Sequence, residues 1–316
     1  MTTGAHGRAP VDGEVRTYYG APVLKEPEWT WEVPWYLFAG GLAGTSSVLA
    51  ATAALRGNPA LARAARLVAA AGAAVSPPLL IADLGRPARF LNMLRVFKPT
   101  SAMSVGSWIL AGYSPASITA ASLDVTGRAP RLRRIADTAA ALLGPAMSTY
   151  TAVLVADSSV PVWHEARNEL PFVFAGSGAA AAGAACVLVA SPDTTAPARR
   201  LAVGGATVEL VAGEVMLRRL GETGEVYDTG RAGAFSKAAK ACTAVGAALV
   251  ALGGGRHTAI ARAGAVAVLA GSVCQRWAVY TAGFASAADP KYVVKPQRER
   301  LRSGQGHRDD AAVRRR

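Results

Sequence analysis

The chain has 316 residues, of which 51% are hydrophobic, and its formal net charge is +13. Such a charge is typical of nucleic-acid binding, but the basic residues flank long apolar runs and do not form one stripe, which excludes that function class. Several apolar runs reach the roughly 20 residues that a helix needs to cross a hydrocarbon core about 30 Å thick, so the sequence predicts an integral membrane protein.

The predicted fold class is an all-α membrane protein with about eight transmembrane helices in a domain of residues 34–284. Residues 1–33 are polar and have no apolar core near Met1, so we expect no cleavable signal there. Small residues such as Gly40 and Gly44 in the first span favour close helix packing. The spans are predicted at about residues 34–55, 61–82, 104–123, 135–155, 170–190, 201–217, 234–252 and 259–282.

Two further segments are expected outside the hydrocarbon core. Residues 83–103 mix basic with apolar side chains, a pattern that favours a short amphipathic helix at the membrane interface after the second span. Residues 285–316 are expected to form a basic, polar tail.

The loops predict the orientation in the membrane. Those at the face opposite the termini are short and contain almost no acidic residues, and the positive-inside rule counts such loops. We therefore expect this face to be cytoplasmic and both termini to be extracytoplasmic, although the C-terminal tail is basic as well. The basic residues of these loops are Arg56, Arg63, Arg66, Arg128, Arg131, Arg133, Arg134, Arg199, Arg200, Arg256 and Arg262.

The sequence predicts neither a metal site nor a haem site. The cysteines Cys186, Cys242 and Cys274 each stand alone in an apolar run, without the C-x-x-C spacing of iron–sulfur or zinc sites. A membrane haem needs histidine ligands inside the helix bundle, whereas the four histidines lie in loops, in tails or at a helix edge. We therefore expect no metal and no permanently bound cofactor.

Ionisable residues at membrane depth are costly, so each one is a candidate functional residue. Glu209 is the deepest of them and lies in the sixth predicted span. It is expected to relay protons, to contact a quinone, or to pair with a Lys or Arg of a neighbouring helix in a purely structural role. Glu214 lies in the same span, five residues later and on a diverging face. Three other ionisable residues lie at the starts of spans, where their side chains are expected to reach the interface; they are Asp137, Lys237 and Lys240.

A second group of polar and aromatic residues lies at the membrane face that carries the termini. A bundle brings the ends of the first, second and fourth spans together there. The group supplies an apolar slot, hydrogen-bond donors and carboxylates that pass protons, which suits a lipid-soluble quinone. Interface anchoring, a loop-fixing salt bridge to Arg86 and a helix–helix hydrogen bond stay open as alternatives. The residues are Glu32, Trp35, Tyr36, Asp83 and Tyr150.

Four segments carry a more specific pattern, above all an Asp-Leu-Gly-Arg-Pro turn that is followed by an aromatic and basic stretch. They are EWTWEVPWYLFAGGLAG (28–44), DLGRPARFLNMLRVFKPTSAMSVGSW (83–108), STYTAVLVADSSVPVWHEARNELPFVFAGSG (148–178) and DPKYVVKPQRERL (289–301). Together they resemble the NrfD/polysulfide reductase membrane-subunit family over nearly the whole chain.

The resemblance implies two four-helix bundles side by side in a bacterial cell membrane. It implies a quinone-interacting anchor subunit of a respiratory oxidoreductase of the formate dehydrogenase, polysulfide reductase or nitrite reductase type, used in anaerobic respiration. The implied partners are a four-cluster ferredoxin-like iron–sulfur subunit and a molybdenum-type catalytic subunit. Menaquinone or ubiquinone is then an exchangeable substrate, and the chain has no catalytic residues of its own.

The resemblance also implies roles for individual residues. Tyr150 matches a tyrosine of the fourth helix that lies at the quinone headgroup, and Glu32, Trp35 and Tyr36 stand where the family has polar residues at the start of the first helix. Polysulfide reductase has an Asn and a His there, and the absence of a His implies different proton chemistry. Asp83 and Glu209 are expected to relay protons. Four basic residues are expected to hold their loop, contact lipid phosphates or dock the partner; they are Arg86, Arg89, Arg95 and Lys98.

Two other function classes fit the same helices. A secondary transporter often uses helices interrupted by Pro and Gly to build its substrate site. A passive anchor tethers an enzyme to the membrane and takes no part in electron transfer. Binding of a quinone analogue separates these classes, because a passive anchor binds none.

Overall fold

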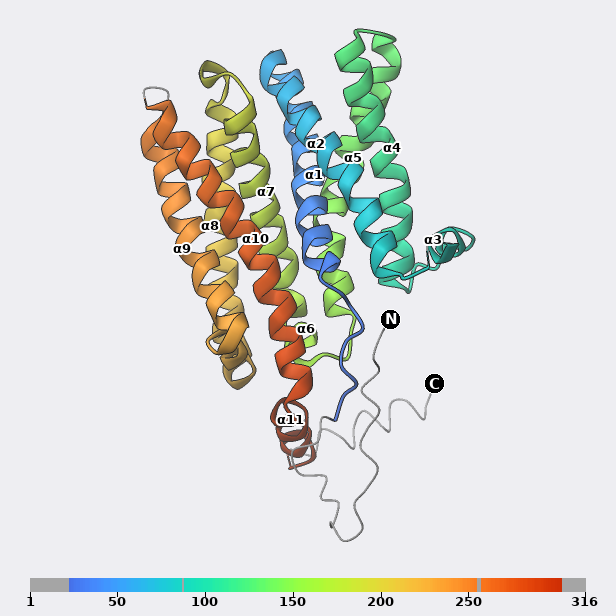
Figure 1. Ribbon diagram of the computed structural model, residues 1–316, viewed down its shortest axis with the longest axis vertical. Coiled ribbons are helices and arrows are strands. Elements are labelled where there is room, and N and C mark those ends of the chain that lie inside the picture. Colours follow the sequence, from blue (N-terminus) through green and yellow to red (C-terminus); the bar gives the residue numbers. More distant parts are fainter. Residues whose placement is uncertain (1–22, 87, 255–256, 303–316) are drawn as a thin grey trace.

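The computed structural model describes residues 23–86, 88–254 and 257–302, whose regular structure is entirely helical (Figure 1). Eight of the described helices have 20 residues or more. They are α1 (Glu32–Leu55), α2 (Pro59–Asp83), α4 (Ala102–Thr126), α5 (Pro130–Ala156), α7 (Leu170–Val189), α8 (Ala196–Leu220), α9 (Gly230–Gly253) and α10 (Thr258–Ala288). Shorter helices are α3 (Ala88–Met93), α6 (Pro161–Glu165), η1 (Ala166–Asn168), η2 (Pro192–Thr194), η3 (Gly221–Tyr227) and α11 (Lys291–Arg302).

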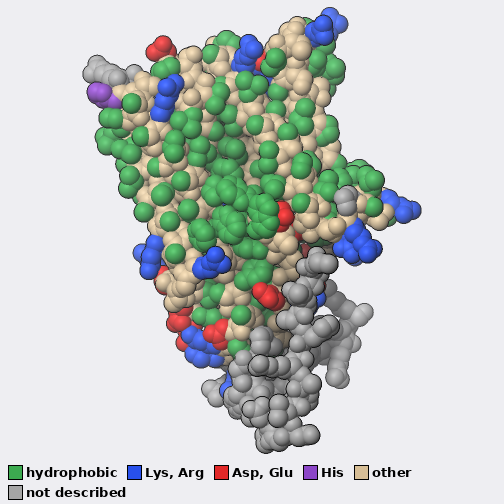
Figure 2. All heavy atoms as spheres, viewed as in Figure 1, with side chains coloured by type: hydrophobic (Ala, Val, Ile, Leu, Met, Phe, Trp, Pro, Cys, Tyr) green, Lys and Arg blue, Asp and Glu red, His purple; other side chains and the backbone are tan. Residues whose placement is uncertain are grey.

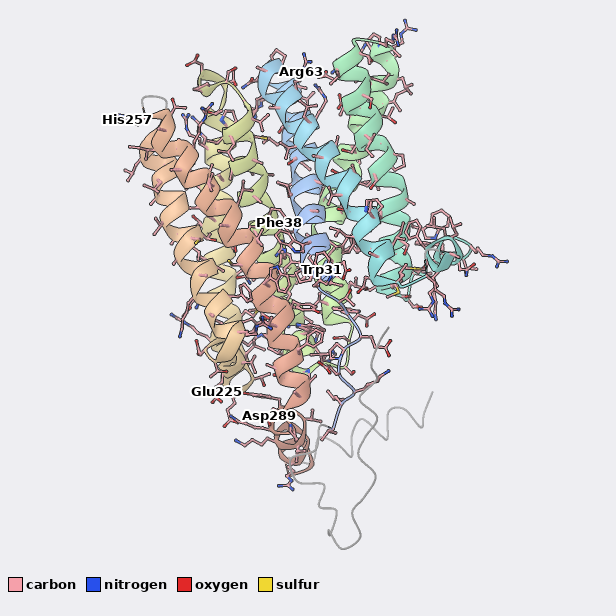
Figure 3. All side chains as sticks on the ribbon, in the orientation of Figure 1. Trp31, Phe38, Arg63, Glu225, His257 and Asp289 are labelled. Carbon is pink, nitrogen blue, oxygen red and sulfur yellow. The ribbon has the colours of Figure 1, made fainter. Side chains whose placement is uncertain are left out.

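The long helices lie side by side in two groups (Figure 1). Helices α1, α2, α4 and α5 pack against one another, as do α7, α8, α9 and α10, and α1 and α5 join the groups by packing on α7. Arg63 and His257 lie at one end of the molecule, whereas Glu225 and Asp289 lie at the other (Figure 3). We call the end with Glu225, α11 and residues 23–31 the terminal face, and the other end the opposite face.

Six of the long helices are sufficiently long and apolar to cross a membrane, namely α1, α2, α5, α7, α9 and α10. Helices α4 and α8 have 25 residues each but are less apolar, because α4 is rich in serine and α8 carries two arginine pairs and two glutamates. Hydrophobic side chains cover the middle of the surface shown in Figure 2, whereas charged side chains lie mainly toward its ends. The all-helical fold is confirmed, and the count of eight spans stays a prediction.

Small residues set the distance between the helices. A Cβ added to Gly44 of α1 would overlap the backbone of Gly144 in α5, and a Cβ added to Gly264 of α10 would lie 2.7 Å from the carbonyl oxygen of Gly246 in α9. Such close approach replaces the hydrophobic driving force that soluble helices have, since lipid tails are as apolar as the side chains.

Two expected segments differ from the structure. The amphipathic helix expected within residues 83–103 is limited to the six residues of α3, which projects from the side of the molecule near the start of α4 (Figure 1). Residues 285–302, expected as part of a polar tail, belong to the end of α10 and to α11. Lys291 and Lys295 tie α11 to η3 through ion pairs with Glu225 and Glu222. Residues 1–22 and 303–316 of the expected terminal segments lie outside the described residues.

Replacing Gly264 with Ala should destabilise the protein by about 1–3 kcal/mol, because the new methyl group meets backbone atoms of α9 that cannot move alone. Gly204→Ala in α8 is the matched control, since a Cβ there meets nothing within 4 Å. Midpoints of thermal unfolding in detergent, followed by circular dichroism, measure both. Equal midpoints for the two variants would show that close α9–α10 packing does not stabilise the fold.

Candidate functional site

A narrow cleft lies among α1, α2, α4 and α5 near the terminal face. Its lining is mainly apolar, with one carboxylate, one serine hydroxyl and two tyrosines. The residues are Trp29, Val33, Tyr36, Leu80, Asp83, Leu84, Met93, Met103, Gly106, Ser107, Tyr150 and Leu154. An apolar cleft with a few polar groups is the usual form of a small-molecule site.

Tyr150 supplies the most informative polar atom of the cleft. Its side chain is 7% exposed, and its buried hydroxyl group has no hydrogen-bond partner. The ring packs edge-on against the ring of Tyr36, with 6.5 Å between the centroids. On the other side it lies against Gly106, where an added Cβ would overlap the ring. Because a buried unpaired hydroxyl costs about 1–3 kcal/mol, this donor points to a ligand or a water.

Asp83 joins the cleft to the segment before α1. Its carboxylate accepts hydrogen bonds from the backbone N–H and the hydroxyl of Thr30, at 3.0 and 2.9 Å. The Thr30 hydroxyl also contacts the carboxylate of Glu32. The two carboxylates therefore lie one hydroxyl group apart, in a row that leads from the cleft to the terminal face.

Trp29 closes the cleft from the side of the second helix group. Its carbonyl oxygen accepts a hydrogen bond of 2.7 Å from the hydroxyl of Tyr280 in α10, and its ring stacks on Trp163 of α6 with 4.9 Å between the centroids. Trp163 in turn donates to the carbonyl of Val279 at 2.7 Å. The residues before α1 are thus held in place by both helix groups.

Of the residues predicted to bind quinone, Tyr36 and Tyr150 line the cleft together with the predicted relay residue Asp83. Glu32 lies one hydrogen-bonded step away, through Thr30. Trp35 does not line the cleft. It is 38% exposed, because it lies about 100° around α1 from Tyr36 and points outward. Its position suits the alternative interpretation, in which it anchors the helix at the interface.

The four basic residues of the segment after α2 are exposed. Arg89 donates to the carbonyl of Leu84 at 3.2 Å and so holds the turn, while apolar side chains of the same segment also face outward. Leu91, Val96 and Phe97 are 67%, 71% and 56% exposed. The segment presents the mixture of cations and apolar groups that suits a lipid surface or a partner. The basic residues are Arg86, Arg89, Arg95 and Lys98.

The structure does not bring Glu209 to this cleft. Glu209 lies in α8, is 4% exposed, and lines a separate cavity in the second helix group. Helix α8 packs against α7 and α9, so Glu209 lies apart from Asp83, and its predicted role as a proton relay stays a prediction.

Sequence reasoning missed several cleft residues and a buried arginine. Trp29 lies before the first span, in residues 28–44, which carry part of the family pattern. Nothing in the sequence distinguishes Gly106 from the many other glycines. Arg276 of α10 is 1% exposed and lies over the ring of Phe174, 3.8 Å from its centroid. A charge inside an apolar span was the available signal for this residue.

A buried charge cluster closes the opposite face of the first helix group. Arg66 of α2, 6% exposed, donates to Asp137 of α5 at 2.8 Å and to Asp124 of α4 at 3.0 Å. Arg133 contacts both carboxylates as well. Asp137, which was expected to reach the interface, belongs to a network of charges that joins three helices.

Comparison with known protein families gives a match that includes the residues of the cleft. The sequence profile described as "Polysulphide reductase, NrfD" matches residues 24–203, which is more than half of the chain. The chain belongs to the NrfD family. No curated protein matches it. The matched part of this NrfD protein runs from the segment before α1 into α8, so it includes every cleft residue and excludes Glu209, α9 and α10.

Membership in the family indicates where the protein lies in the cell and that it works with other subunits. NrfD proteins are membrane subunits of oxidoreductase complexes and work with partner subunits. With six apolar helices of sufficient length, the chain is a multi-pass membrane protein.

Arg66→Gln should destabilise the first helix group by about 3 kcal/mol, because it removes the only buried cation of the cluster and leaves the two carboxylates with the partly exposed Arg133 alone. Arg63→Gln is the control, since the Arg63 side chain is 57% exposed and lies 3.9 Å from Asp124. We expect this control to change stability by less than about 1 kcal/mol. Unfolding midpoints in detergent measure both, and a larger loss for Arg63→Gln would refute the role of the cluster.

Proposed function

We propose that this protein exchanges electrons between the membrane quinone pool and a docked redox subunit of a respiratory oxidoreductase. The observation that carries the proposal is the unpaired hydroxyl of Tyr150, buried in an apolar cleft at the terminal face. A quinone ring supplies what this site lacks, since its carbonyl oxygen accepts the hydrogen bond and its apolar body suits the lining. Menaquinone and ubiquinone both have this chemistry.

The outer edge of the cleft gives the quinone a route from lipid. Met103 is 43% exposed and Met93 is half-buried, and both line the cleft beside Leu84 at the end of α2. Methionine side chains are flexible and unbranched, so they adapt easily to a passing ring. We propose that the quinone enters between α2 and α4, beside residues 86–98, which include α3 and which we call the α3 segment.

Reduction of a quinone to a quinol takes up two electrons and two protons, and oxidation releases them. Asp83 lies in the cleft and connects through Thr30 to Glu32 near the surface. We propose that these two carboxylates carry the protons between the ring and the terminal face, while Tyr150 and Tyr36 hold the ring. Glu209 lies too far along the second helix group to serve the ring directly.

Electrons require a partner at the same face. We propose that a four-cluster ferredoxin-like iron–sulfur subunit docks there, over the α3 segment, and connects the cleft to a molybdenum-type catalytic subunit. The exposed cations of the α3 segment, from Arg86 to Lys98, would bind acidic side chains of the partner or lipid phosphates. A formate-oxidising partner would reduce the quinone, and a polysulfide- or nitrite-reducing partner would oxidise the quinol.

The membrane arrangement follows from the same proposal. We infer that α4 and α8 also cross the bilayer, because each packs along helices that are apolar enough to do so. The eight spans then form two four-helix bundles, α1–α2–α4–α5 and α7–α8–α9–α10. From the arginines of the opposite face, we propose that this face lies in the cytoplasm of a bacterial cell and that the cleft and both termini lie outside.

Replacing Tyr150 with Phe tests the site. Loss of one hydrogen bond to the quinone should weaken binding of a quinone analogue to the purified protein about five- to tenfold, and lower quinone turnover in the assembled complex. Tyr113→Phe is the matched control, because the Tyr113 hydroxyl is buried, bonds Ser47 at 2.7 Å and lies outside the cleft. Unchanged binding and turnover in Tyr150→Phe would remove Tyr150 from the site, and absence of any binding by the wild type would favour a passive anchor.

A methyl group added at Gly106 tests the shape of the cleft without removing a polar atom. The new Cβ overlaps the Tyr150 ring, so Gly106→Ala should displace the phenol and lower quinone turnover. Gly112→Ala, on the same helix, meets only the flexible end of Leu143 at 3.3 Å and should leave turnover intact. Equal turnover in the two variants would contradict the proposed position of the ring.

A further inference from the structure

A second cavity lies in the second helix group, away from the quinone cleft. Its volume is about 260 Å³, and it extends among α8, α9 and α10, with η3 at one end. No residue lines both the cavity and the cleft. The cavity residues are Glu209, Leu210, Gly213, Glu214, Met216, Leu217, Tyr227, Ser236, Lys240, Ala244 and Gln275.

Two buried polar side chains end in this cavity without a partner. Glu209 is 4% exposed and Tyr227 is 2% exposed, and neither the Oε2 atom of Glu209 nor the hydroxyl of Tyr227 has a hydrogen-bond partner. Leaving such atoms dry costs about 1–3 kcal/mol each, and more for a charged group. A cavity of this size has room for several waters, which would satisfy both atoms.

Arg276 supplies a positive charge next to Glu209. One of its terminal nitrogens donates to the carbonyl of Phe174 at 3.1 Å, whereas its Nε and Nη1 atoms have no partner. Arg276 and Glu209 influence each other electrostatically, but no ion pair within 4.0 Å joins them among the described residues. Both charges are therefore buried and incompletely paired, an arrangement that suits a site whose charge changes during function.

The cavity is charged at its mouth. Glu214 and Lys240 both line it, lie 3.9 Å apart and are 49% and 47% exposed. Glu209 lies eleven residues before the end of α8 at Leu220, so it is about 16 Å deeper than the terminal face along the helix. Polar groups thus run from the terminal face to the middle of the helices and stop at Glu209.

We propose that this cavity is a water-filled half-channel that carries protons from the terminal face to the Glu209 carboxylate. A proton that arrives through the water binds to the carboxylate and neutralises it, which leaves the charge of Arg276 unbalanced. Lys240 from α9, Glu214 from α8 and Tyr227 from η3 are the other titratable groups that line the path, and Phe174 and Ser177 of α7 lie beside the charged pair.

Arg276 also lies at the boundary between the two helix groups. A Cβ added at Gly41 of α1 would lie 3.2 Å from its Nη2 atom, so the guanidinium group lies close to the helix that carries Tyr36 of the quinone cleft. Protonation of Glu209 is thereby linked to α1 through one side chain. The link to quinone turnover rests on the proposed function, whereas the hydrated path does not.

Cysteine labelling tests the path without quinone chemistry. In a background with Cys186, Cys242 and Cys274 replaced by Ser, Ser236→Cys and Ala244→Cys should react with a charged, membrane-impermeant thiosulfonate added at the terminal face. Val245→Cys is the matched control: Val245 neighbours Ala244, is 56% exposed and points away from the cavity, so in lipid it should not react. Failure of both cavity cysteines to react in assembled complexes, or equal reaction at Val245, would overturn the half-channel.

Proton counting tests the role of Glu209. In proteoliposomes that contain the assembled complex, Glu209→Gln should lower the number of protons moved per quinone while electron transfer continues, and Glu209→Asp should restore it. Glu222→Gln, at an exposed position of η3 outside the cavity, should leave the ratio unchanged. An unchanged ratio in Glu209→Gln would refute the proposal. Tyr150→Phe should slow turnover without changing the labelling, so failure of the quinone site and failure of the half-channel are distinguishable.

Discussion

The cost of an unpaired polar group in hydrocarbon is the constraint on which this structure depends. Helices satisfy their backbone groups internally, and most polar side chains at depth are paired as well. Ser47 bonds Tyr113, Ser177 bonds Ser272, and Arg66 binds two carboxylates. Against this background, the buried polar atoms that lack a partner are informative, and the most prominent of them lie in or beside two cavities.

The two cavities serve different parts of the proposed function. The cleft near Tyr150 offers one donor, one carboxylate and an apolar lining, which suits a quinone ring. The cavity near Glu209 offers charged and polar groups from its mouth to its inner end, which suits water and protons. Helix α1 lies between them, since it carries Tyr36 and lies close to Arg276 at Gly41.

Much of the fold was predictable, because charges are excluded from long apolar runs and each predicted span falls on one long helix. The convergence of Tyr36, Asp83 and Tyr150 followed from their places at the ends of three helices and from the family pattern. The rotation of each helix about its own axis was harder to predict from the sequence. Spans built from Ala and Gly have little hydrophobic periodicity, so nothing in the sequence turned Trp35 outward or placed Glu209 in a different cavity.

Tertiary contacts determine the position of α11 and the pairing of the buried charges. Helix α11 is polar, but Glu222 and Glu225 hold it by ion pairs, and the sequence did not reveal these pairs across more than 60 residues. Nothing in the sequence showed that Asp124 and Asp137 share Arg66 of α2. In both cases the partner is distant in sequence, and only the packing of the helices brings it close.

An electron cryo-microscopy structure of the assembled complex with a bound quinone analogue tests the central claim most directly. The account predicts ring density in the cleft of α1, α2, α4 and α5, with one carbonyl oxygen within hydrogen-bond distance of the Tyr150 hydroxyl. Ring density in the cavity beside Glu209, or on the lipid-facing surface with the cleft closed, would contradict it.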